Sequence, residues 1–415
     1  MKYFDPNDYT GSDIEKINSA VADAEKSGSF VRMGKRLPDE NSSRDFWLID
    51  SAILLPENMT FIICNTLIKL SDASRDNFFR TGNAPLYNDG TEPAVINNVH
   101  IIGEGKAVLE GADHPRSTGD SNKMLGVQKI TPYPVDGEDR SKRMTYGTDA
   151  GKEGEHQKGD WRNVGVLFIK AVDFSIENIT IRKAHSWAIS LEYCRKGVVR
   201  NIEFDTSEYR IIDGVEERLL NQDGLDLRRG CRDILIENIT GCSGDDLIAL
   251  TAIGTKERPA GTFTSIEYCG GSSDIRNDDV FNITIRNIRG YSGGGYFIIR
   301  FLNQKGVKMH HIFVDGLLET APPGHYGWAA IKIGAPNYAG SAALGETYAF
   351  QIRNVRCQTR RGITFGAPLR DSVISDVLYF RCKEEHSITS HHGEGEYPLP
   401  NVFFHNMHSI DSFEK

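Results

Sequence analysis

The residues of this sequence best suited to acid–base chemistry are four aspartates between residues 221 and 250, Asp223, Asp226, Asp245 and Asp246. They stand in apolar stretches typical of β-strands, "NQDGLDL" and "SGDDLIAL". Carboxyl groups held a few ångströms apart repel one another, which raises the pKa of at least one of them. When one acid keeps its proton to donate and another stays charged, such a cluster can activate water. Taken alone, a segment such as "SGDD" would more often be a plain turn.

A repeat in the sequence predicts that these aspartates meet on neighbouring turns of a coil. Asp223 lies about 22 residues before Asp245 and about 23 residues before Asp246, which is the length of one solenoid unit. A similar interval separates copies of a short phrase, such as "FSIENITI", "GVVRNIEF" and "SVISDVLYF", in which a polar residue precedes an aliphatic one. The polar residues are Asn178, Asn201, Asn238, Asn287, His311, Asn354 and Asp376. Some of their intervals match the short period, and we interpret the longer ones as that period with insertions.

The repeat also predicts the fold. A unit of about 20 to 30 residues, with short strands and no crossover helix, is typical of a parallel β-helix, whose stacked coils bury a common core. We therefore expect an all-β chain in which residues 1–415 form a single right-handed parallel β-helix domain. In that fold Asp223 and the Asp245–Asp246 pair gather their carboxylates on one lateral face.

Strand alternation predicts which side chains face the core. The inward positions of the two acidic segments are expected to be Leu225, Leu227, Leu247 and Ala249. Asp226 and Asp246 are then left facing outward. The repeated Asn is expected at an inward turn, where the side-chain amides would stack as a hydrogen-bonded ladder.

The N-terminal segment, residues 1–30, predicts a cap for one end of the coil. In "DIEKINSAVADAEKSG", apolar residues recur at helical spacing after Ser12, which suits an N-cap, and the pattern stops at Gly28. A solenoid needs such a cap to cover its open end. Three segments are expected to leave the coil as insertions, at about residues 112–163, 252–278 and 320–346. Insertions in a solenoid collect on one face, which is commonly the binding face.

Composition narrows the class of protein. The chain has 415 residues, of which 39% are hydrophobic and 25% charged, a globular composition with enough apolar residues for a sizeable core. A net charge of -9 argues against nucleic acid and membrane as partners. The seven cysteines lack CxxC spacing, which disfavours a zinc site and a disulfide framework, and we expect no cofactor or resident metal. The first residues lack a signal pattern, so we expect a cytoplasmic protein.

The acidic segments and their flanks resemble one enzyme family. "NQDGLDL" and "SGDDLIAL" are similar to the Asn-Thr-Asp-Gly and Gly-Asp-Asp-x-Ile-Ala signatures of the polygalacturonase-like glycoside hydrolases, glycoside hydrolase family 28, which share a pectin-lyase-like β-helix. "IIGEGKAVLEG" and "AHSWAISLEYCRKGVVRNIEF" resemble other coils of these enzymes, so the likeness covers about residues 10–335. The resemblance implies that Asp245 is the general acid. It also implies that Asp223 and Asp246 position and deprotonate the attacking water, with inversion at the anomeric carbon.

Two positions depart from the family pattern. In "YSGGGYF", Gly294 stands where the family has the histidine of Gly-His-Gly, and in "AAIKIG", Ala330 replaces the arginine of Arg-x-Lys while Lys332 is kept. In the family the missing residues orient the acid and bind the sugar acid. Arg300, at the end of "GGGYFIIR", and His325, in the insertion just before Lys332, are candidate substitutes. Arginine and lysine would suit a uronate carboxylate, arginine through a bidentate contact. The full set of expected substrate-binding residues is His185, Asp226, Arg300, His325 and Lys332.

These observations lead to one expected function and two alternatives. The leading expectation is an inverting glycoside hydrolase that acts on α-linked, uronic-acid-containing oligosaccharides of the pectin type, with exo action favoured by the long insertions. One alternative is a β-helix polysaccharide lyase in which Arg300 or Lys332 is the base and the aspartates hold Ca²⁺. The other is a carbohydrate-binding or structural β-helix that has lost catalysis. In each case the expected partner is an oligosaccharide or polysaccharide, and the sequence does not define the oligomeric state.

Overall fold

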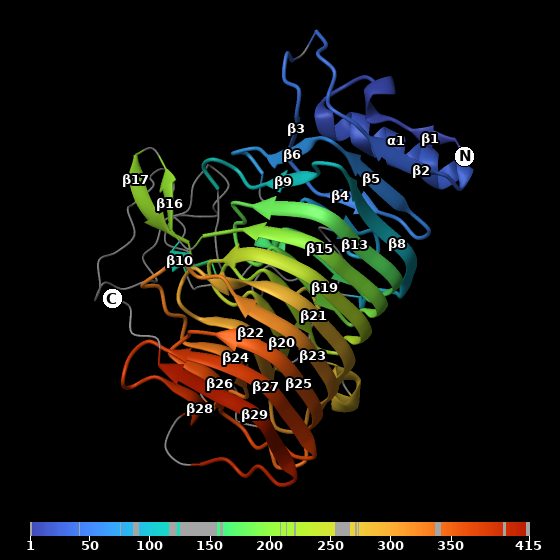
Figure 1. The fold of residues 1–415 in the computed structure, drawn as a ribbon. Helices are drawn as coiled ribbons and strands as arrows, with labels where there is room; N and C mark the ends of the chain where they lie inside the picture. The colour runs from blue at the N-terminus through green and yellow to red at the C-terminus, as the bar shows by residue number, and fades with distance from the viewer. Residues whose placement is uncertain are drawn as a thin grey trace. The chain divides into compact units, whose positions relative to one another are not determined.

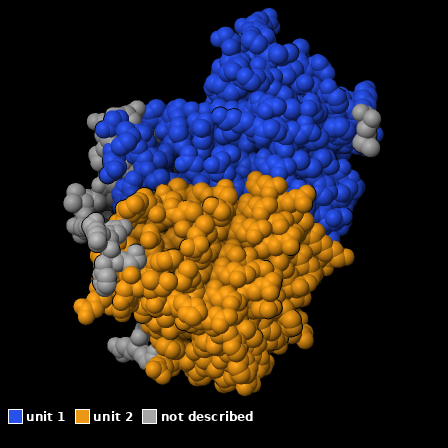
Figure 2. All heavy atoms as spheres, in the orientation of Figure 1, with its two compact units in different colours: residues 1–190, 202–222, 259–269 blue, residues 191–201, 223–258, 270–415 orange. Residues whose placement is uncertain are grey.

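A computed structural model describes most of the chain and groups it into two compact units (Figure 2). Unit 1 comprises Met1–Ser190, Ile202–Gln222 and Pro259–Cys269, and unit 2 comprises Leu191–Asn201, Asp223–Arg258 and Gly270–Lys415. The described residues are 2–40, 42–74, 76–85, 91–115, 123–124, 156–157, 161–207, 209–212, 214–219, 221–253, 266–269, 272, 274–336, 342–392 and 396–411.

Unit 1 consists mainly of short parallel strands (Figure 1). One ladder runs through β1 (Tyr3–Phe4), β2 (Phe30–Met33), β5 (Thr60–Cys64), β8 (Ile96–Glu104) and β13 (Ala171–Arg182). Also paired in parallel are β3 (Trp47–Ile49), β6 (Leu67–Leu70) and β9 (Val108–Glu110), and separately β4 (Ile53–Leu55), β7 (Phe79–Thr81) and β12 (Val166–Ile169). Val31, Phe61 and Ile101 are Cα partners on β2, β5 and β8 and are fully buried, so the ladder stacks apolar side chains along a common core.

Unit 2 contains two longer parallel ladders. The first is β19 (Arg232–Ser243), β21 (Val280–Ser292), β23 (Met309–Glu319), β25 (Thr347–Cys357), β27 (Ser372–Arg381) and β29 (Val402–Asp411). The second is β18 (Leu225–Arg228), β20 (Ile248–Ala252), β22 (Phe297–Asn303), β24 (Ala329–Ile333), β26 (Arg361–Phe365) and β28 (Ser387–His391). From β19 to β28 the chain alternates between the ladders, so each coil adds one strand to each (Figure 1).

The remaining elements are short. The 3-10 helices are η1 (Pro6–Asp8), η3 (Trp161–Asn163) and η4 (Ile275–Asp278), and β10 (Lys123–Met124) pairs antiparallel with β11 (His156–Gln157). β14 (Ile189–Glu192) and β15 (Arg195–Asp205) each have residues in both units. β16 (Tyr209–Ile212) and β17 (Val215–Arg218) form an antiparallel hairpin. No helix in the described part of the chain is long and apolar enough to cross a membrane.

Parallel ladders with one strand per coil confirm the predicted β-helix fold. The core rows are aliphatic: Leu225, Ile248, Ile299, Ile331 and Ile363 are successive Cα partners on the second ladder of unit 2, and all are fully buried. Of the three predicted insertions, residues 116–122, 125–155, 158–160, 254–265, 270–271, 273 and 337–341 lie outside the described residues. The β16–β17 hairpin was not among the predicted insertions.

The repeated polar residue forms a ladder, but it faces outward rather than inward. Asn178, Asn201, Asn238, Asn287, His311, Asn354 and Asp376 all have φ between 53° and 60°. This left-handed conformation is one that Asn adopts more readily than most residues, and it bends each strand so that the following aliphatic residue turns to the core. Asn238 Nδ2 donates to Asn201 Oδ1 at 2.8 Å, and Asn287 Nδ2 donates to Asn238 Oδ1 at 3.2 Å. The predicted inward placement is wrong because the bend itself turns the side chain to solvent.

The predicted cap helix is α1 (Asp13–Ser27) in unit 1. Ser12 and Glu15 form a capping box, and Gly28 ends the helix with φ 59°. The apolar side of the helix is buried, including Ile17, Ala20 and Ala24, and the helix contacts β1, β2, β3 and β4. Glycine suits residue 28 because it adopts a left-handed φ without the steric cost that a Cβ atom brings.

Candidate active site

The structure brings three of the four aspartates together in unit 2. Asp223 precedes β18, and Asp245 and Asp246 lie in the turn between β19 and β20. Carboxylate oxygens of Asp223, Asp245 and Asp246 all lie within 4.8 Å of one another. The backbone N–H of Asp246 donates to Asp223 Oδ1 at 2.7 Å, which fixes one carboxylate against the next coil. The prediction that one coil length would gather these carboxylates is confirmed.

The register corrects the predicted inward positions by one residue in the second strand. Leu225 is the Cα partner of Ile248, and Asp226 is the partner of Ala249. Paired residues on parallel strands face the same side, so Ile248 rather than Leu247 continues the core row of Leu225. Ala249 therefore shares the face of Asp226. The error arose because the two adjacent aspartates of "SGDD" fit the coil length equally well, which leaves the register open by one residue.

Burial and mutual repulsion shape the acidity of the cluster. The pKa of Asp223 is raised well above its usual value, first by burial and then by the charges of Asp226, Asp245 and Asp246. Burial also raises the pKa of Asp226 well above its usual value, although Arg228 opposes the shift. Asp226 is 1% exposed, and its Oδ2 has no hydrogen-bond partner among the described residues. The cluster is therefore able to retain a proton where an isolated aspartate would be fully ionised.

Arg300 sets Asp246 apart from the other aspartates. Burial raises the pKa of Asp246, but Arg300 Nη1 donates to Asp246 Oδ2 at 3.2 Å and the N–H of Phe297 donates to Asp246 Oδ1 at 3.2 Å. Both contacts favour the charged form and oppose the effect of burial. Of the three clustered aspartates, Asp245 is the one that is only partly buried. Asp246 is thus held by two donors, beside an Asp245 that is more accessible to solvent.

Two cations stand beside the aspartates on the second ladder. Arg300 and Lys332 are Cα partners on β22 and β24, and the Phe297 ring lies beneath both, with its centroid 5.7 Å from Arg300 Cζ and 4.6 Å from Lys332 Nζ. Burial, and then the like charge of Arg300, lowers the pKa of Lys332 to about 8. Among the described residues no carboxylate forms an ion pair with Lys332. Its ammonium is thus a desolvated cation able to receive an anionic group.

The two departures from the family pattern lie in the same unit. His325 reaches the strand end near Gly294, because its Nε2 lies 2.7 Å from the carbonyl oxygen of Ser292 and its ring packs edge-on against Tyr291. Ala330 is fully buried on β24. A guanidinium at that position would have to be accommodated beside both Arg300 and Lys332. The substrate-binding role of His325 stays a prediction.

His185 belongs to unit 1 and has a buried backbone partner. Its side chain is 5% exposed, and Nε2 accepts a hydrogen bond from the backbone N–H of Ala112 at 2.9 Å. A Cβ atom added at Gly111 would lie 3.0 Å from the imidazole, so this glycine permits the close approach. These contacts hold the ring against the preceding coil. A role for His185 in substrate binding stays a prediction.

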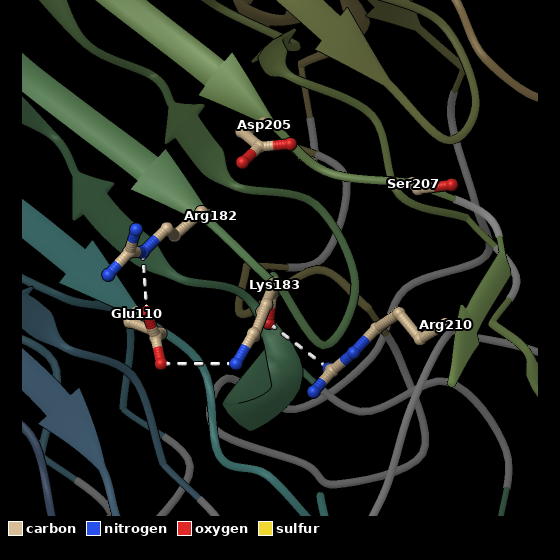
Figure 3. Close-up of a pocket in the computed structure, with 6 residues that line it drawn as sticks. All are labelled: Glu110, Arg182, Lys183, Asp205, Ser207 and Arg210. Carbon is tan, nitrogen blue, oxygen red and sulfur yellow. Dashed lines mark hydrogen bonds and ion pairs between the residues drawn. The ribbon is translucent and has the colours of Figure 1, made fainter. Parts of the chain in front are cut away.

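Unit 1 has a charged pocket of about 480 Å³, shown in Figure 3. It is lined by Glu110, Arg182, Lys183, Asp205, Ser207 and Arg210. The Glu110 carboxylate pairs with Arg182 at 2.5 Å and with Lys183 at 3.2 Å, and Arg210 Nη1 donates to the Lys183 carbonyl at 3.4 Å (Figure 3). Burial raises the pKa of Glu110, but Lys183, Arg182 and Lys69 outweigh it, so the pKa is lowered. Since this carboxylate stays charged and paired, we assign it no acid–base role.

The Asp223–Asp245–Asp246 cluster is the one group of described residues with the geometry to hold a metal ion. Three carboxylates supply the hard oxygen ligands that Ca²⁺ prefers. Phe297, whose ring lies beside both cations of the site, was not predicted as a site residue. No distinct signal marked this residue, because an aromatic side chain at the start of a strand is usually part of the core.

Comparisons with known proteins agree with this fold. The chain is similar to the crystal structure of endo-xylogalacturonan hydrolase from Aspergillus tubingensis, with 10% identity, a TM-score of 0.53 and 100% of both chains covered. It is also similar to polygalacturonase from Erwinia carotovora ssp. carotovora, with 10% identity, a TM-score of 0.50, and 98% of this chain and 95% of that one covered. A tailspike protein mutant of E. coli bacteriophage HK620 matches with 12% identity, a TM-score of 0.50, and 97% and 63% covered.

At these identities the likeness is one of fold. No family model matches the sequence, and no curated protein matches it either. The resemblance to polygalacturonase-like β-helices is thereby confirmed for the architecture.

Proposed function

We propose that this protein hydrolyses α-glycosidic bonds in uronic-acid-containing oligosaccharides of the pectin type. The observation that carries the proposal is the cluster of Asp223, Asp245 and Asp246, with oxygens within 4.8 Å, beside the cations Arg300 and Lys332. Carboxyl groups provide the acid and base of glycoside hydrolysis. The neighbouring cations match the carboxylate that distinguishes a uronic acid from a neutral sugar. Two hydrolases of galacturonan-type polymers among the structural neighbours add support.

The proposed mechanism divides the work among the three aspartates. Two oxygens within 4.8 Å can both accept hydrogen bonds from one water molecule, since each such bond spans about 2.8 Å. Asp223 and Asp246 would hold that water and take its proton as it attacks the anomeric carbon. Asp245, which is less buried, would protonate the glycosidic oxygen as the bond to the leaving sugar breaks. A single displacement of this kind inverts the anomeric configuration.

The short spacing makes stereochemistry an essential measurement. In most inverting glycosidases the two carboxyl groups are about 6.5 to 9.5 Å apart, which is longer than the oxygen spacing here. Time-resolved proton NMR of a digest of galacturonic acid oligosaccharides and rhamnogalacturonan oligosaccharides reports the bond cleaved, the first anomer formed and the sugar released. We expect the first product to be a monosaccharide, which indicates exo action. We expect it to appear as the inverted anomer, which indicates a single displacement.

The matched pair of variants is Asp245→Asn and Asp376→Asn. We expect Asp245→Asn to lower kcat by about 10²- to 10⁴-fold, the contribution typical of a general acid. Asp376→Asn makes the same chemical change at an exposed ladder position where other coils already have Asn, so activity should be unchanged. If the native protein binds these oligosaccharides and alters none of them, hydrolysis is refuted and a carbohydrate-binding role takes its place.

One observation favours a second candidate, a polysaccharide lyase. The lowered pKa of Lys332, about 8, would let it act as a base near neutral pH. Lys332 would remove the proton at C5 of the uronate, the C4–O bond would break, and a C4–C5 double bond would form, while the departing sugar oxygen takes a proton from water. The aspartates would hold Ca²⁺. An unsaturated product that forms in the assay, but not after a calcium chelator is added, would establish this reaction. Saturated products that still form in the presence of the chelator support hydrolysis.

A further inference from the structure

Trp328 differs from the other tryptophans of the chain in its exposure. The sequence contains four tryptophans, and Trp47 and Trp161 are fully buried while Trp187 is 5% exposed. Trp328 is 37% exposed. An aromatic side chain left open to solvent contributes little to the core, yet it offers a large apolar face to a ligand.

The position of Trp328 relates it directly to the proposed site. Its backbone N–H donates to the Tyr296 carbonyl at 2.9 Å, which continues the register that pairs Phe297 with Ala329 on β22 and β24. Trp328 lies in the bend directly before β24, and Lys332 is four residues further along, roughly 13 Å along the backbone. His392 links the two, because its ring stands edge-on to the indole, and burial and then the charges of Lys332 and Arg300 lower its pKa. That length accommodates more than one sugar ring.

Two further side chains surround the indole. Arg360 Cζ lies 5.9 Å from the Trp328 ring centroid, and His392 lies edge-on at 6.3 Å with an interplanar angle of 86°. Arg360 is exposed, and among the described residues no carboxylate forms an ion pair with its guanidinium. A cation held near an aromatic ring keeps its planar donors available, and these match a carboxylate through two parallel hydrogen bonds. The surroundings of Trp328 thus combine an apolar face with a receptor for an anion.

We propose that Trp328 and Arg360 form a second acidic-sugar subsite, in which the indole stacks on a pyranose ring and Arg360 binds the carboxylate of that sugar. This inference rests on the proposed function, because Lys332 and Arg300 hold the first uronate. It makes the preferred substrate one with adjacent uronic acids. A substrate whose second sugar is neutral keeps the stacking and loses the ion pair.

The test measures binding in the Asp245→Asn background, where turnover does not interfere. Acrylamide quenching of tryptophan fluorescence reports chiefly on Trp328, because the other three indoles are buried. We expect digalacturonic and trigalacturonic acid to protect the fluorescence from acrylamide, and galacturonic acid monomer to protect it much less. In Trp328→Phe the protection should disappear. Calorimetric titration of the same ligands gives the affinity independently of the fluorophore.

The matched variants are Arg360→Ala and Arg356→Ala. Arg356 is also exposed and lies over an aromatic ring, with its Cζ 5.7 Å from the Phe380 centroid, but it has no place in the proposed subsite. In the Asp245→Asn background we expect Arg360→Ala to weaken digalacturonate binding about 10-fold or more and to leave monomer binding unchanged. In the otherwise native protein the same change should raise KM with little change in kcat. Arg356→Ala should bind both ligands as the parent does.

The outcomes separate this inference from the proposed function. If the native protein is active but Trp328→Phe and Arg360→Ala leave the affinity for digalacturonate unchanged, the subsite is overturned. The proposed hydrolysis is then unaffected. Oligomer binding that depends on Arg360, without any turnover by the native protein, overturns hydrolysis and supports the subsite. The absence of binding for all three ligands overturns both.

Discussion

Lys332 stands directly beside Arg300, as its Cα partner across β22 and β24. Two like charges on a buried face are unfavourable unless an anion joins them, and this accounts for part of the lowered pKa of Lys332, to about 8, after burial itself. Asp246 already pairs with Arg300, and under the proposed function a substrate carboxylate would join it in balancing the two cations. Arg300, the candidate substitute for the arginine that Ala330 replaces in the family pattern, lies on the strand one coil before Ala330, and its role in substrate binding stays a prediction.

The charge of Lys332 should control substrate affinity near pH 8. A lysine whose pKa is lowered loses its charge as pH rises through that lowered value, so the KM for a uronate oligosaccharide should rise from about pH 7 to about pH 9.5. Complete loss of the charge-assisted contact should raise KM about 10- to 100-fold. Lys332→Arg should keep KM low throughout, because arginine stays protonated. A methyl-esterified substrate, which lacks the carboxylate, is the control. A KM of the native protein for the uronate substrate that does not change with pH contradicts this role.

Arg300 should set the acid limb of the activity profile. Arg300→Ala removes the guanidinium that donates to Asp246, so the pKa of Asp246 should rise further. The base is then charged only at higher pH, and we expect the acid limb of the kcat profile to move upward. The measurement is kcat against pH for Arg300→Ala, with Arg356→Ala as the matched surface change. An unmoved acid limb would mean that Asp246 does not act as the base.

Asp226 should reduce stability at neutral pH. Its folded-state pKa is raised, mainly by burial, so folding favours the protonated form. Stability from such a group is fully present below the unfolded-state pKa and is lost as pH rises through the folded-state pKa. Asp226→Asn mimics the protonated acid, so its free energy of unfolding should increasingly exceed that of the native protein above about pH 4, by up to about 1 to 3 kcal/mol. Urea unfolding across pH tests this, and a difference that shrinks as pH rises rules it out.

The cap should depend on a buried ion pair. Asp13 Oδ1 lies 2.6 Å from Arg36 Nε, with side-chain exposures of 2% and 1%, and Asp13 Oδ2 accepts from the Leu48 N–H at 2.8 Å. Asp13→Ala leaves Arg36 with Asp39 as its carboxylate partner and removes two charged hydrogen bonds, so it should cost about 1 to 3 kcal/mol. Lys26→Ala breaks an exposed pair in the same helix and should cost at most about 0.5 kcal/mol. Urea unfolding followed by circular dichroism compares them, and equal losses would contradict the buried role.

The features predicted correctly from the sequence are those governed by repetition. The Asn phrase and its short interval indicated the coils, and the Asp223–Asp246 spacing equals one coil length. The capping signals at Ser12 and Gly28 defined the helix, because both ends have side-chain or backbone requirements that few residues meet. Each of these predictions needed only local chemistry and a period.

The features that failed depend on a single residue of register or on three-dimensional neighbours. A one-residue shift in the register of β18 and β20 decides whether Ile248 or Leu247 faces the core. The sequence of the acidic turn does not define that register. The outward direction of the Asn ladder follows from its positive φ, which composition alone does not reveal. The pairing of Trp328 with Arg360 joins residues from different coils, so no local pattern signals it.

The outward-facing Asn ladder separates the scaffold of this protein from its loops. Asn201 and Asn238, 37 residues apart, are joined by the same side-chain hydrogen bond as Asn238 and Asn287, 49 residues apart. Each left-handed bend thus restores the same strand register, whatever the number of inserted residues between one bend and the next. A loop can then lengthen, shorten or be exchanged without shifting the register of the next rung. Substrate specificity in such a molecule can change by exchange of loops, because the stacking of the strands does not depend on loop length.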